Sequence, residues 1–291
     1  MVGIGTLKRL AAAKGPTTLR QRIGAVLSSV SSPEPLKRVL YSVYGARLQA
    51  RLLAGPLPHH VGVVLDGNRR YAEILGHDHG EAYRLGTEKV DSLLQWSDEL
   101  GIPVVTVWSL SLDNLERGSD DVQSILSIVE AKLPKLQEFQ STLQHPRQIR
   151  VSGRVELLPA SLQDAIRRVE RETTGDSPFY LNIALGYGGR EEIVDAVKDL
   201  IREQCEQGFT PDEVIEQITP KAIGNHLYFS GMPDPDLIIR TSGEIRLSGF
   251  MLWGSVYSEY YFCDALWPAF RKVDFLRAIR SYQGRRRRFG A

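Results

Sequence analysis

The 291-residue sequence has few cysteines and no long apolar segment, and both absences narrow its class. Its two cysteines, Cys205 and Cys263, exclude a disulfide-rich secreted scaffold, and with six dispersed histidines they show no zinc-binding spacing. No run approaches the roughly eighteen apolar residues of a membrane-spanning helix, and the start of the chain lacks a signal-peptide core. We therefore expect a cytoplasmic protein, and a hydrophobic fraction of 42% is typical of a folded globular domain.

Several common catalytic signatures are also missing. There is no GxxxxGK[ST] phosphate loop and no GxGxxG after the first predicted strand, so nucleoside triphosphate and dinucleotide binding lose their main support. No GxSxG nucleophile elbow is present, and neither cysteine has a setting typical of a nucleophile. Asp120 and Asp121 are an adjacent aspartate pair after Ser119, where a helical pattern begins; this placement indicates a helix N-terminus rather than a metal site.

The net charge of +1 conceals two basic ends and an acidic body. Residues 1–60 carry a net charge of +8 and residues 271–291 a net charge of +7, which leaves the middle of the chain at −14. Basic segments favour a membrane surface, nucleic acid or phosphorylated small molecules, and solvated tails are the alternative. The run from Arg285 to Arg288 lacks interleaved aromatic residues and a recognition motif, so we expect no nucleic-acid partner.

The pattern of residues 1–55 predicts a basic, helical N-terminal extension rather than a part of the core. Helical patterns cover 18–30 and 35–53, and a Ser/Pro-rich stretch between them prevents one continuous helix. In the second range, apolar residues recur at helical spacing with basic residues around them. Such a helix can make peripheral contact with a membrane or pack on its own domain, and the sequence leaves both open.

From residue 56 onward, short runs rich in Val and Ile alternate with amphipathic helical patterns. The runs cover 61–65, 104–110, 180–185 and 237–239, with a further one at 149–151. The clearest helical pattern begins near Ile193 and ends at Gly208. Strands buried on both faces that alternate with helices are typical of parallel sheets. The sequence therefore predicts one α/β domain over 56–291, with a mainly parallel central sheet flanked by helices.

Four of the five predicted strands, all except the one at 149–151, are followed by residues suited to binding phosphate. The segments are DGNRR at 66–70, SLDN at 111–114, GYGGR at 186–190 and RTSGE at 240–244. Ligands of parallel sheets bind at the carboxyl ends of the strands, so these segments are expected to converge. Guanidinium groups bind phosphate bidentately, glycines admit backbone N–H groups, and a carboxylate can hold Mg²⁺. Each segment alone is also explained as a surface turn, but four together indicate a phosphate site.

At these residues the sequence closely resembles the cis-prenyltransferases, the undecaprenyl diphosphate synthase family. The resemblance runs from about residue 58 to the C-terminus. It rests on HHVGVVLDGNRRYA, SLSLDNLER, LNIALGYGGREEIVDA, PDPDLIIRTSGEIRLSGFMLW, VYSEYYF, LWPAF and RRRRFG, in the family's order and spacing. Within the family, the sequence is most similar to the actinobacterial short-chain branch that makes Z,E-farnesyl diphosphate. The DDxxD motifs of trans-prenyltransferases are missing from the sequence.

The resemblance implies a reaction, a cofactor and an oligomeric state. The reaction joins isopentenyl diphosphate to an allylic diphosphate, forms a Z double bond and releases diphosphate, with Mg²⁺ as cofactor. An apolar tunnel would hold the growing chain, and we expect the 120–140 helix and neighbouring strands to wall it. A C-terminal R-x-G element at Arg288 and Gly290 matches one that completes the partner subunit's site, which implies a homodimer.

The resemblance also assigns roles to individual residues. Asp66 matches the metal-associated aspartate, Glu259 matches a Mg²⁺-linked glutamate, and Ser111 and Asn114 match residues for positioning and deprotonation. The loop around the allylic diphosphate corresponds to Gly67, Asn68, Arg69 and Arg70. The isopentenyl diphosphate site corresponds to Arg240, Arg246 and Ser248. Two further arginines, Arg117 and Arg190, look like supports for these loops.

The sequence departs from the family pattern near the allylic site. Arg69 stands for a glycine and Tyr71 for a tryptophan, while Tyr83 aligns with the histidine of GHxxG and His79 with an arginine. His77 and His79 are therefore candidate substitutes, with exposed loop histidines as the alternative. We expect a Z,E-farnesyl diphosphate synthase. The alternatives are a medium- or long-chain synthase, a lavandulyl-type coupling enzyme, and a non-catalytic partner subunit, whose loss of the Asp/Arg pattern is not seen here.

Overall fold

The computed structural model describes residues 34–117 and 120–285, with side chains described from residue 41 onward and those of Arg117 and Asp120 left out. The chain divides into a unit of residues 1–44 and a unit of residues 45–291. Helix α2 (Glu34–Leu52) begins in the first unit and ends in the second, where Leu48 and Leu52 are buried in the core. The predicted helix over 35–53 is therefore confirmed, and the one over 18–30 lies outside the described residues.

The second unit is built on a six-stranded sheet in which every strand pairs in parallel with its neighbours, in the order β3-β4-β2-β1-β5-β6. The strands are β1 (His60–Val64), β2 (Val104–Ser111), β3 (Gln148–Ser152), β4 (Tyr180–Tyr187), β5 (Leu237–Arg240) and β6 (Glu259–Phe262). All five predicted strands are present, and the single α/β domain with a parallel sheet is confirmed. Strand β6 was not predicted, because its half-buried residues lack a Val/Ile-rich run.

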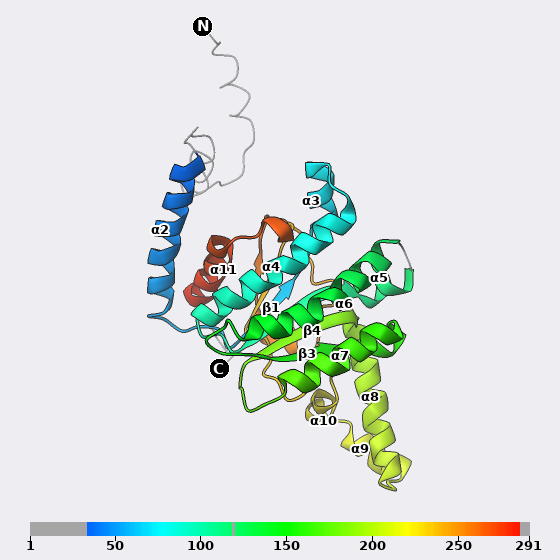
Figure 1. Cartoon of the computed structure of the whole chain (residues 1–291). Coiled ribbons are helices and arrows are strands. Elements are labelled where there is room, and N and C mark those ends of the chain that lie inside the picture. Colours follow the sequence, from blue (N-terminus) through cyan, green and yellow to red (C-terminus); the bar gives the residue numbers. More distant parts are fainter. Residues whose placement is uncertain (1–33, 118–119, 286–291) are drawn as a thin grey trace, which may run out of the picture. The chain divides into compact units, whose positions relative to one another are not determined.

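Helices connect the strands and cover the sheet (Figure 1). They are α3 (Asn68–Leu75), α4 (His79–Glu99), α5 (Leu112–Arg117), α6 (Asp120–Gln140), α7 (Ala160–Thr173), α8 (Gly189–Glu206), α9 (Pro211–Gln217), α10 (Pro220–Asn225) and α11 (Lys272–Gly284). Helix α6 has the predicted bounds, and α8 ends two residues before Gly208, whose φ of +87° favours glycine. None of the described helices is long and apolar enough to cross a bilayer.

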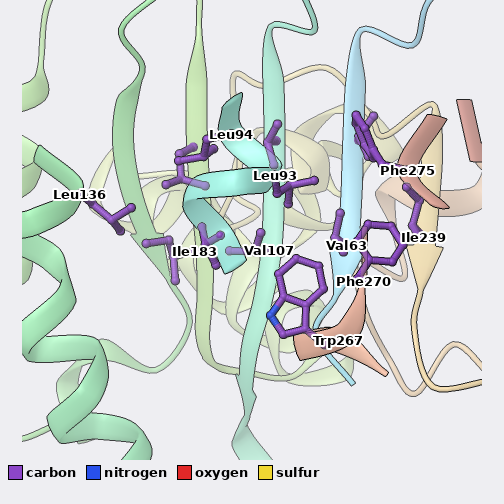
Figure 2. Close-up of a cluster of buried hydrophobic side chains, with 14 of the residues drawn as sticks. Val63, Leu93, Leu94, Val107, Leu136, Ile183, Ile239, Trp267, Phe270 and Phe275 are labelled. Carbon is purple, nitrogen blue, oxygen red and sulfur yellow. The ribbon is translucent and has the colours of Figure 1, made fainter. Parts of the chain in front are cut away.

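The main core lies between one face of the sheet and helices α4, α6 and α11. Figure 2 shows Leu93 and Leu94 of α4 among the side chains of neighbouring strands, with Leu136 of α6 beside Ile183 of β4. Near Val63 of β1 and Ile239 of β5, the core is completed by the fully buried rings of Trp267, Phe270 and Phe275. Since parallel strands buried on both faces need cover from helices, this packing fixes α4 and α6 over the sheet centre.

A buried polar chain crosses the centre of the sheet at His60. This ring is fully buried, its Nδ1 lies 2.7 Å from the Pro233 carbonyl oxygen, and its Nε2 lies 2.7 Å from Thr106 Oγ1. The carbonyl can only accept, so Nδ1 carries the proton and Nε2 accepts from the Thr106 hydroxyl. Asn182 Nδ2 donates to the same hydroxyl at 3.0 Å, which links β1, β2 and β4.

We predict that acid destabilises the protein through His60. Burial lowers the pKa of His60 from 6.5 to about 4, so between these values the unfolded chain binds a proton that the native state does not. The free energy of unfolding should therefore be highest above pH 6.5 and fall by about 3 kcal/mol as the pH drops to 4. Urea unfolding of the wild type and of His60→Gln at several pH values measures this term. Equal pH slopes for the two proteins would contradict it.

Candidate active site

The polar residues predicted at the strand ends gather between β1 and β5, where the strand order of the sheet reverses. Strand β2 lies on one side of β1 and β5 on the other, so the loops after β1 and β5 diverge at their carboxyl ends. Thr241, directly after β5, joins these loops because its Oγ1 accepts from the backbone N of Asp66 at 3.0 Å. On the other side, the backbone N of Trp267 donates to the Asp66 carbonyl at 3.0 Å. Asp66 is thus fixed by two segments distant in sequence.

A buried guanidinium brings three of the predicted site residues together. Arg240 is 5% exposed, and its Nη2 lies 2.8 Å from Asp66 Oδ2. Its Nη1 donates to Ser248 Oγ and to the Arg246 carbonyl oxygen, both at 2.6 Å. The last residue of β5 therefore orients both the carboxylate after β1 and the 246–248 segment. Charge-assisted contacts of this kind are short and directional.

A glutamate that the sequence did not single out joins the two arginine-bearing loops. Glu244 Oε1 lies 3.0 Å from Arg70 Nη2, and its Oε2 lies 2.5 Å from Arg246 Nη1. Arg70 also donates to the Ser242 carbonyl oxygen at 3.0 Å. The side chains of Arg70 and Arg246 are 49% and 62% exposed, so both remain open to an anion. In the sequence, an acid within a basic loop has no signal that separates it from ordinary surface.

The loop after β1 requires its glycine. Gly67 has a φ of +100°, and a Cβ there would lie 2.8 Å from a Leu266 side-chain carbon. The next residue, Asn68, begins α3, and its Nδ2 donates to the Leu65 carbonyl at 2.9 Å. Its buried Oδ1 has no hydrogen-bond partner within the described part of the chain. The loop therefore presents Arg69 and Arg70 at the positive end of a helix.

A polar cavity of about 470 Å³ opens at this rim. Its lining includes the predicted residues Asp66, Gly67, Asn68, Arg69, Arg70 and Asn114. A neighbouring apolar cavity, with a volume of about 50 Å³, lies between α4, α6 and the sheet. The two cavities share Leu65, Asn68, Tyr83, Ser109 and Ile125 in their linings. A charged group and a hydrocarbon chain attached to it can therefore be bound in adjoining spaces.

The apolar cavity has the wall expected for α6. Val129 and Leu133 of α6 line it together with Val107 of β2 and Ile183 of β4, and Val107 and Ile183 are among the side chains in Figure 2. Helix α4 forms a further wall that the sequence did not indicate. Long-range pairing of helices is hard to predict from one sequence, because many amphipathic faces suit one another.

Two residues after β2 have different placements. The Ser111 hydroxyl accepts from the Asn114 backbone N at 3.2 Å and thereby caps the start of α5. The Asn114 side chain is exposed and lines the polar cavity. The structure thus places Asn114 at the predicted site, while Ser111 holds the turn that carries it.

His79 and Tyr83, where the sequence departs from the family pattern near the allylic site, have different surroundings. His79 Nδ1 lies 3.0 Å from Asp121 Oδ1, at the starts of α4 and α6. Asp121 lines the polar cavity, whereas Tyr83 lines both cavities. Burial and the nearby Asp121 raise the pKa of Tyr83 to about 12, so its hydroxyl stays protonated and can donate to an anion. The sequence offered His77 and His79 as candidate substitutes and gave no role to Tyr83, although Tyr83 aligns with the family's histidine.

The GYGGR segment supports the neighbouring loop of residues 246–251. A Cβ at Gly189 would lie 2.1 Å from the Gly249 carbonyl oxygen, so only glycine allows this approach. The Tyr187 hydroxyl accepts from the Met251 backbone N at 3.1 Å and donates to Glu192 Oε2 at 2.5 Å. Burial raises the pKa of Glu192 to about 7. Arg190 is exposed at the start of α8.

Glu259 does not lie beside Asp66 in a single chain. It pairs with Leu237 at the start of β5, whereas Arg240 and Asp66 lie at the opposite end of the strands. Its carboxylate lies 2.5 Å from Arg285 Nη1. The side chain of Arg117, together with Arg288 and Gly290, is outside the described residues.

Asp66 fits a Mg²⁺ ion that is bound together with a diphosphate. Its side chain is 31% exposed and lines the polar cavity, beside the arginines that would hold phosphate oxygens. Within the described residues, no three Asp, Glu, His or Cys side chains gather as a metal site. Mg²⁺ is commonly held by one or two carboxylates plus substrate phosphates, so a single carboxylate is sufficient.

Comparison with known proteins identifies the family. The family model described as "Putative undecaprenyl diphosphate synthase" matches residues 64–290. The chain belongs to this cis-prenyltransferase family. An isoprenyl transferase of Thermus thermophilus is 51% identical over 255 residues, which cover 88% of this chain and 97% of the relative. The protein is thus an isoprenyl transferase with cis-prenyl diphosphate synthase activity.

Two further cis-prenyltransferases define the range of related activities. The (2Z,6E)-farnesyl diphosphate synthase of Thermobifida fusca is 46% identical over 88% of this chain and 98% of the relative. A crystal structure of lavandulyl diphosphate synthase from Lavandula x intermedia in complex with dimethylallyl diphosphate matches with a TM-score of 0.73 and 33% sequence identity. The match covers 79% of this chain and 97% of the lavandulyl diphosphate synthase chain. Identity to the Thermus protein exceeds that to the Thermobifida enzyme, so overall similarity does not favour the actinobacterial branch that the motifs suggested.

We predict that Gly189→Ala weakens the use of isopentenyl diphosphate. The new methyl group would displace the Gly249 carbonyl and with it Ser248, and losing one contact to a charged group raises KM on the order of ten-fold. Steady-state kinetics with each substrate varied in turn checks this. Gly175→Ala is the matched control, because no atom lies within 4 Å of its added Cβ. An unchanged KM in Gly189→Ala would show that the loop position does not matter.

Proposed function

We propose that the protein joins one isopentenyl diphosphate to a short allylic diphosphate and makes a Z-configured product, chiefly Z,E-farnesyl diphosphate. The observation that carries this proposal is the junction of the two cavities at Tyr83 and Ser109. A diphosphate suits the arginine-lined side, and a prenyl chain suits the apolar side. Binding both parts of one molecule places its reactive carbon at the junction.

Two loops bind the two substrates in this proposal. The allylic diphosphate lies against Gly67 to Arg70, with its hydrocarbon between α4 and α6. Isopentenyl diphosphate binds Arg246 and Ser248, which Arg240 orients. Glu244 contacts Arg70 and Arg246 together, so the two sites are adjacent. Adjacent sites hold the alkene near the allylic carbon and remove most of the entropic cost of the encounter.

The chain's own residues then assist bond cleavage, bond formation and proton loss. As the allylic C–O bond breaks, negative charge grows on the departing diphosphate, and Arg69 and Arg70 stabilise it. When bound at Asp66, Mg²⁺ supplies further charge neutralisation on that diphosphate. The apolar wall excludes water from the cationic carbon. Asn114 positions the isopentenyl group, which loses a proton to a diphosphate oxygen after the new bond forms, and Ser111 holds the turn that carries Asn114.

A short product is supported by the small apolar cavity. A volume of about 50 Å³ is enough for only a few water molecules, so even a short chain requires side chains to move. Forcing additional atoms into a packed site costs about 1–3 kcal/mol or more, and the cost grows with each unit added. The Thermobifida fusca relative is named for a fifteen-carbon product, the length proposed here.

A homodimer follows from the position of Glu259. This residue begins the edge strand β6, and Val256 and Tyr257 just before it are 70% and 73% exposed. A second copy packed on this edge would cover apolar surface and bring its Glu259, Arg288 and Gly290 to the first copy's site. The expected peripheral membrane contact concerns the basic N-terminal region, most of which is outside the described residues, and it stays a prediction.

The test of the product is an incubation with excess isopentenyl diphosphate. Purified protein, Mg²⁺ and each allylic diphosphate of one to three isoprene units are combined, and products are sized and their double bonds assigned. We expect a fifteen-carbon Z product from the two-unit substrate. Products longer than twenty carbons would favour the medium- or long-chain synthase, and a branched product of two allylic units would favour lavandulyl-type coupling.

We predict that Asp66→Ala lowers kcat by on the order of 100-fold or more while the protein stays folded. The reason is the loss of the carboxylate that lines the diphosphate cavity and holds Arg240 in position. Glu73→Ala is the matched control, because Glu73 is an exposed carboxylate in the lining of the same cavity. Single-turnover rates measure the effect. A loss of only a few-fold in Asp66→Ala, or an equal loss in both variants, would contradict the assignment.

A further inference from the structure

A buried lysine in the wall of the apolar cavity forms an ion pair with a half-buried aspartate. Lys132 of α6 lines the cavity, its side chain is 10% exposed, and its Nζ lies 2.5 Å from Asp91 Oδ2 on α4. The other carboxylate oxygen of Asp91 is buried, and no hydrogen-bond partner for it exists in the described ranges. Charged groups are rarely buried unless they are paired, and an ion pair against hydrocarbon lining does not contribute to a hydrophobic site.

Lys132 lines the cavity well beyond its entrance. Ile125 and Tyr83 are at the junction with the polar cavity, and Lys132 and Asp91 follow them by seven and eight residues on α6 and α4. With a rise of 1.5 Å per helical residue, the pair lies about 10–12 Å beyond the junction. Extended prenyl chains add roughly 5 Å per isoprene unit, from carbon–carbon bonds of about 1.5 Å. A chain of two to three units therefore reaches the level of the pair.

The ion pair also joins the two helices that must separate for a longer chain. The cavity is too small for a prenyl chain as it stands, so binding requires α4 and α6 or their side chains to move apart. Beyond the junction, Lys132 and Asp91 join the two helices directly, and separating the helices there would leave the buried ammonium group of Lys132 without its partner. A hydrocarbon chain offers neither charge a hydrogen bond.

We propose that the Lys132–Asp91 ion pair is a clamp between α4 and α6 that limits product length to about three isoprene units. This inference rests on the proposed function, because it assumes that the prenyl chain enters the apolar cavity. It assigns specificity to two charged side chains rather than to a bulky residue. Ser109, at the junction, is too small to block the chain.

Three variants test the clamp. Asp91→Leu/Lys132→Met removes both charges at similar volume, Asp91→Lys/Lys132→Asp reverses the pair, and Glu99→Leu/Lys272→Met removes a pair that joins α4 to α11 outside the cavity lining. With excess isopentenyl diphosphate, the apolar variant should raise the fraction of products above fifteen carbons about ten-fold or more. The reversed pair and the control should keep the wild-type distribution, and the rate of the first condensation should stay within a few-fold.

Wild-type protein provides a second test that needs no substitution. Binding of allylic diphosphates with two, three, four and five isoprene units should strengthen up to three units and then weaken about ten-fold. If the apolar variant folds and keeps the wild-type product lengths, or if wild-type protein binds the five-unit compound as tightly as the three-unit one, the clamp is wrong. Absence of any condensation by wild-type protein would instead contradict the proposed function.

Discussion

The contact between Arg240 and Asp66 is the interaction on which the polar rim depends. Arg240 is 5% exposed, and its two terminal nitrogens donate to the Asp66 carboxylate, the Ser248 hydroxyl and the Arg246 carbonyl. These partners come from the loops after β1 and β5, on either side of the point where the strand order reverses. A single buried charge therefore sets the position of a carboxylate that lines the polar cavity and of the exposed Arg246 segment.

The second constraint is that the charged rim opens directly onto the hydrophobic core. The apolar cavity lies where α4 and α6 cover the sheet, and Trp267 is part of its lining. Figure 2 shows the Trp267 ring beside Phe270, near Val63 of β1. The indole Nε1 donates to the Gly86 carbonyl at 2.6 Å, and the backbone N of Trp267 donates to Asp66, so one residue supports both cavities. A molecule with an ionic head and an apolar chain matches this arrangement at both ends.

The sequence predicted the sheet and the rim well because both depend on local patterns. Val- and Ile-rich runs marked five strands, and the polar segments after them converge as parallel topology requires. Contacts between segments distant in sequence were missed. Nothing in the RTSGE segment indicates that Glu244 contacts Arg70, 174 residues away, and nothing near Lys132 indicates the pair with Asp91, 41 residues away. Strand β6 was missed because its residues are half-buried at an edge.

The central claim is that one prenyl diphosphate occupies both cavities at once. A crystal structure with a non-hydrolysable thiolo analogue of the two-unit allylic diphosphate, Mg²⁺ and isopentenyl diphosphate tests it most directly. We expect the allylic diphosphate group to lie against the loop from Gly67 to Arg70. Its hydrocarbon chain should lie between α4 and α6 and end at the level of Lys132. An allylic chain bound elsewhere, with the space between α4 and α6 still closed, would contradict it.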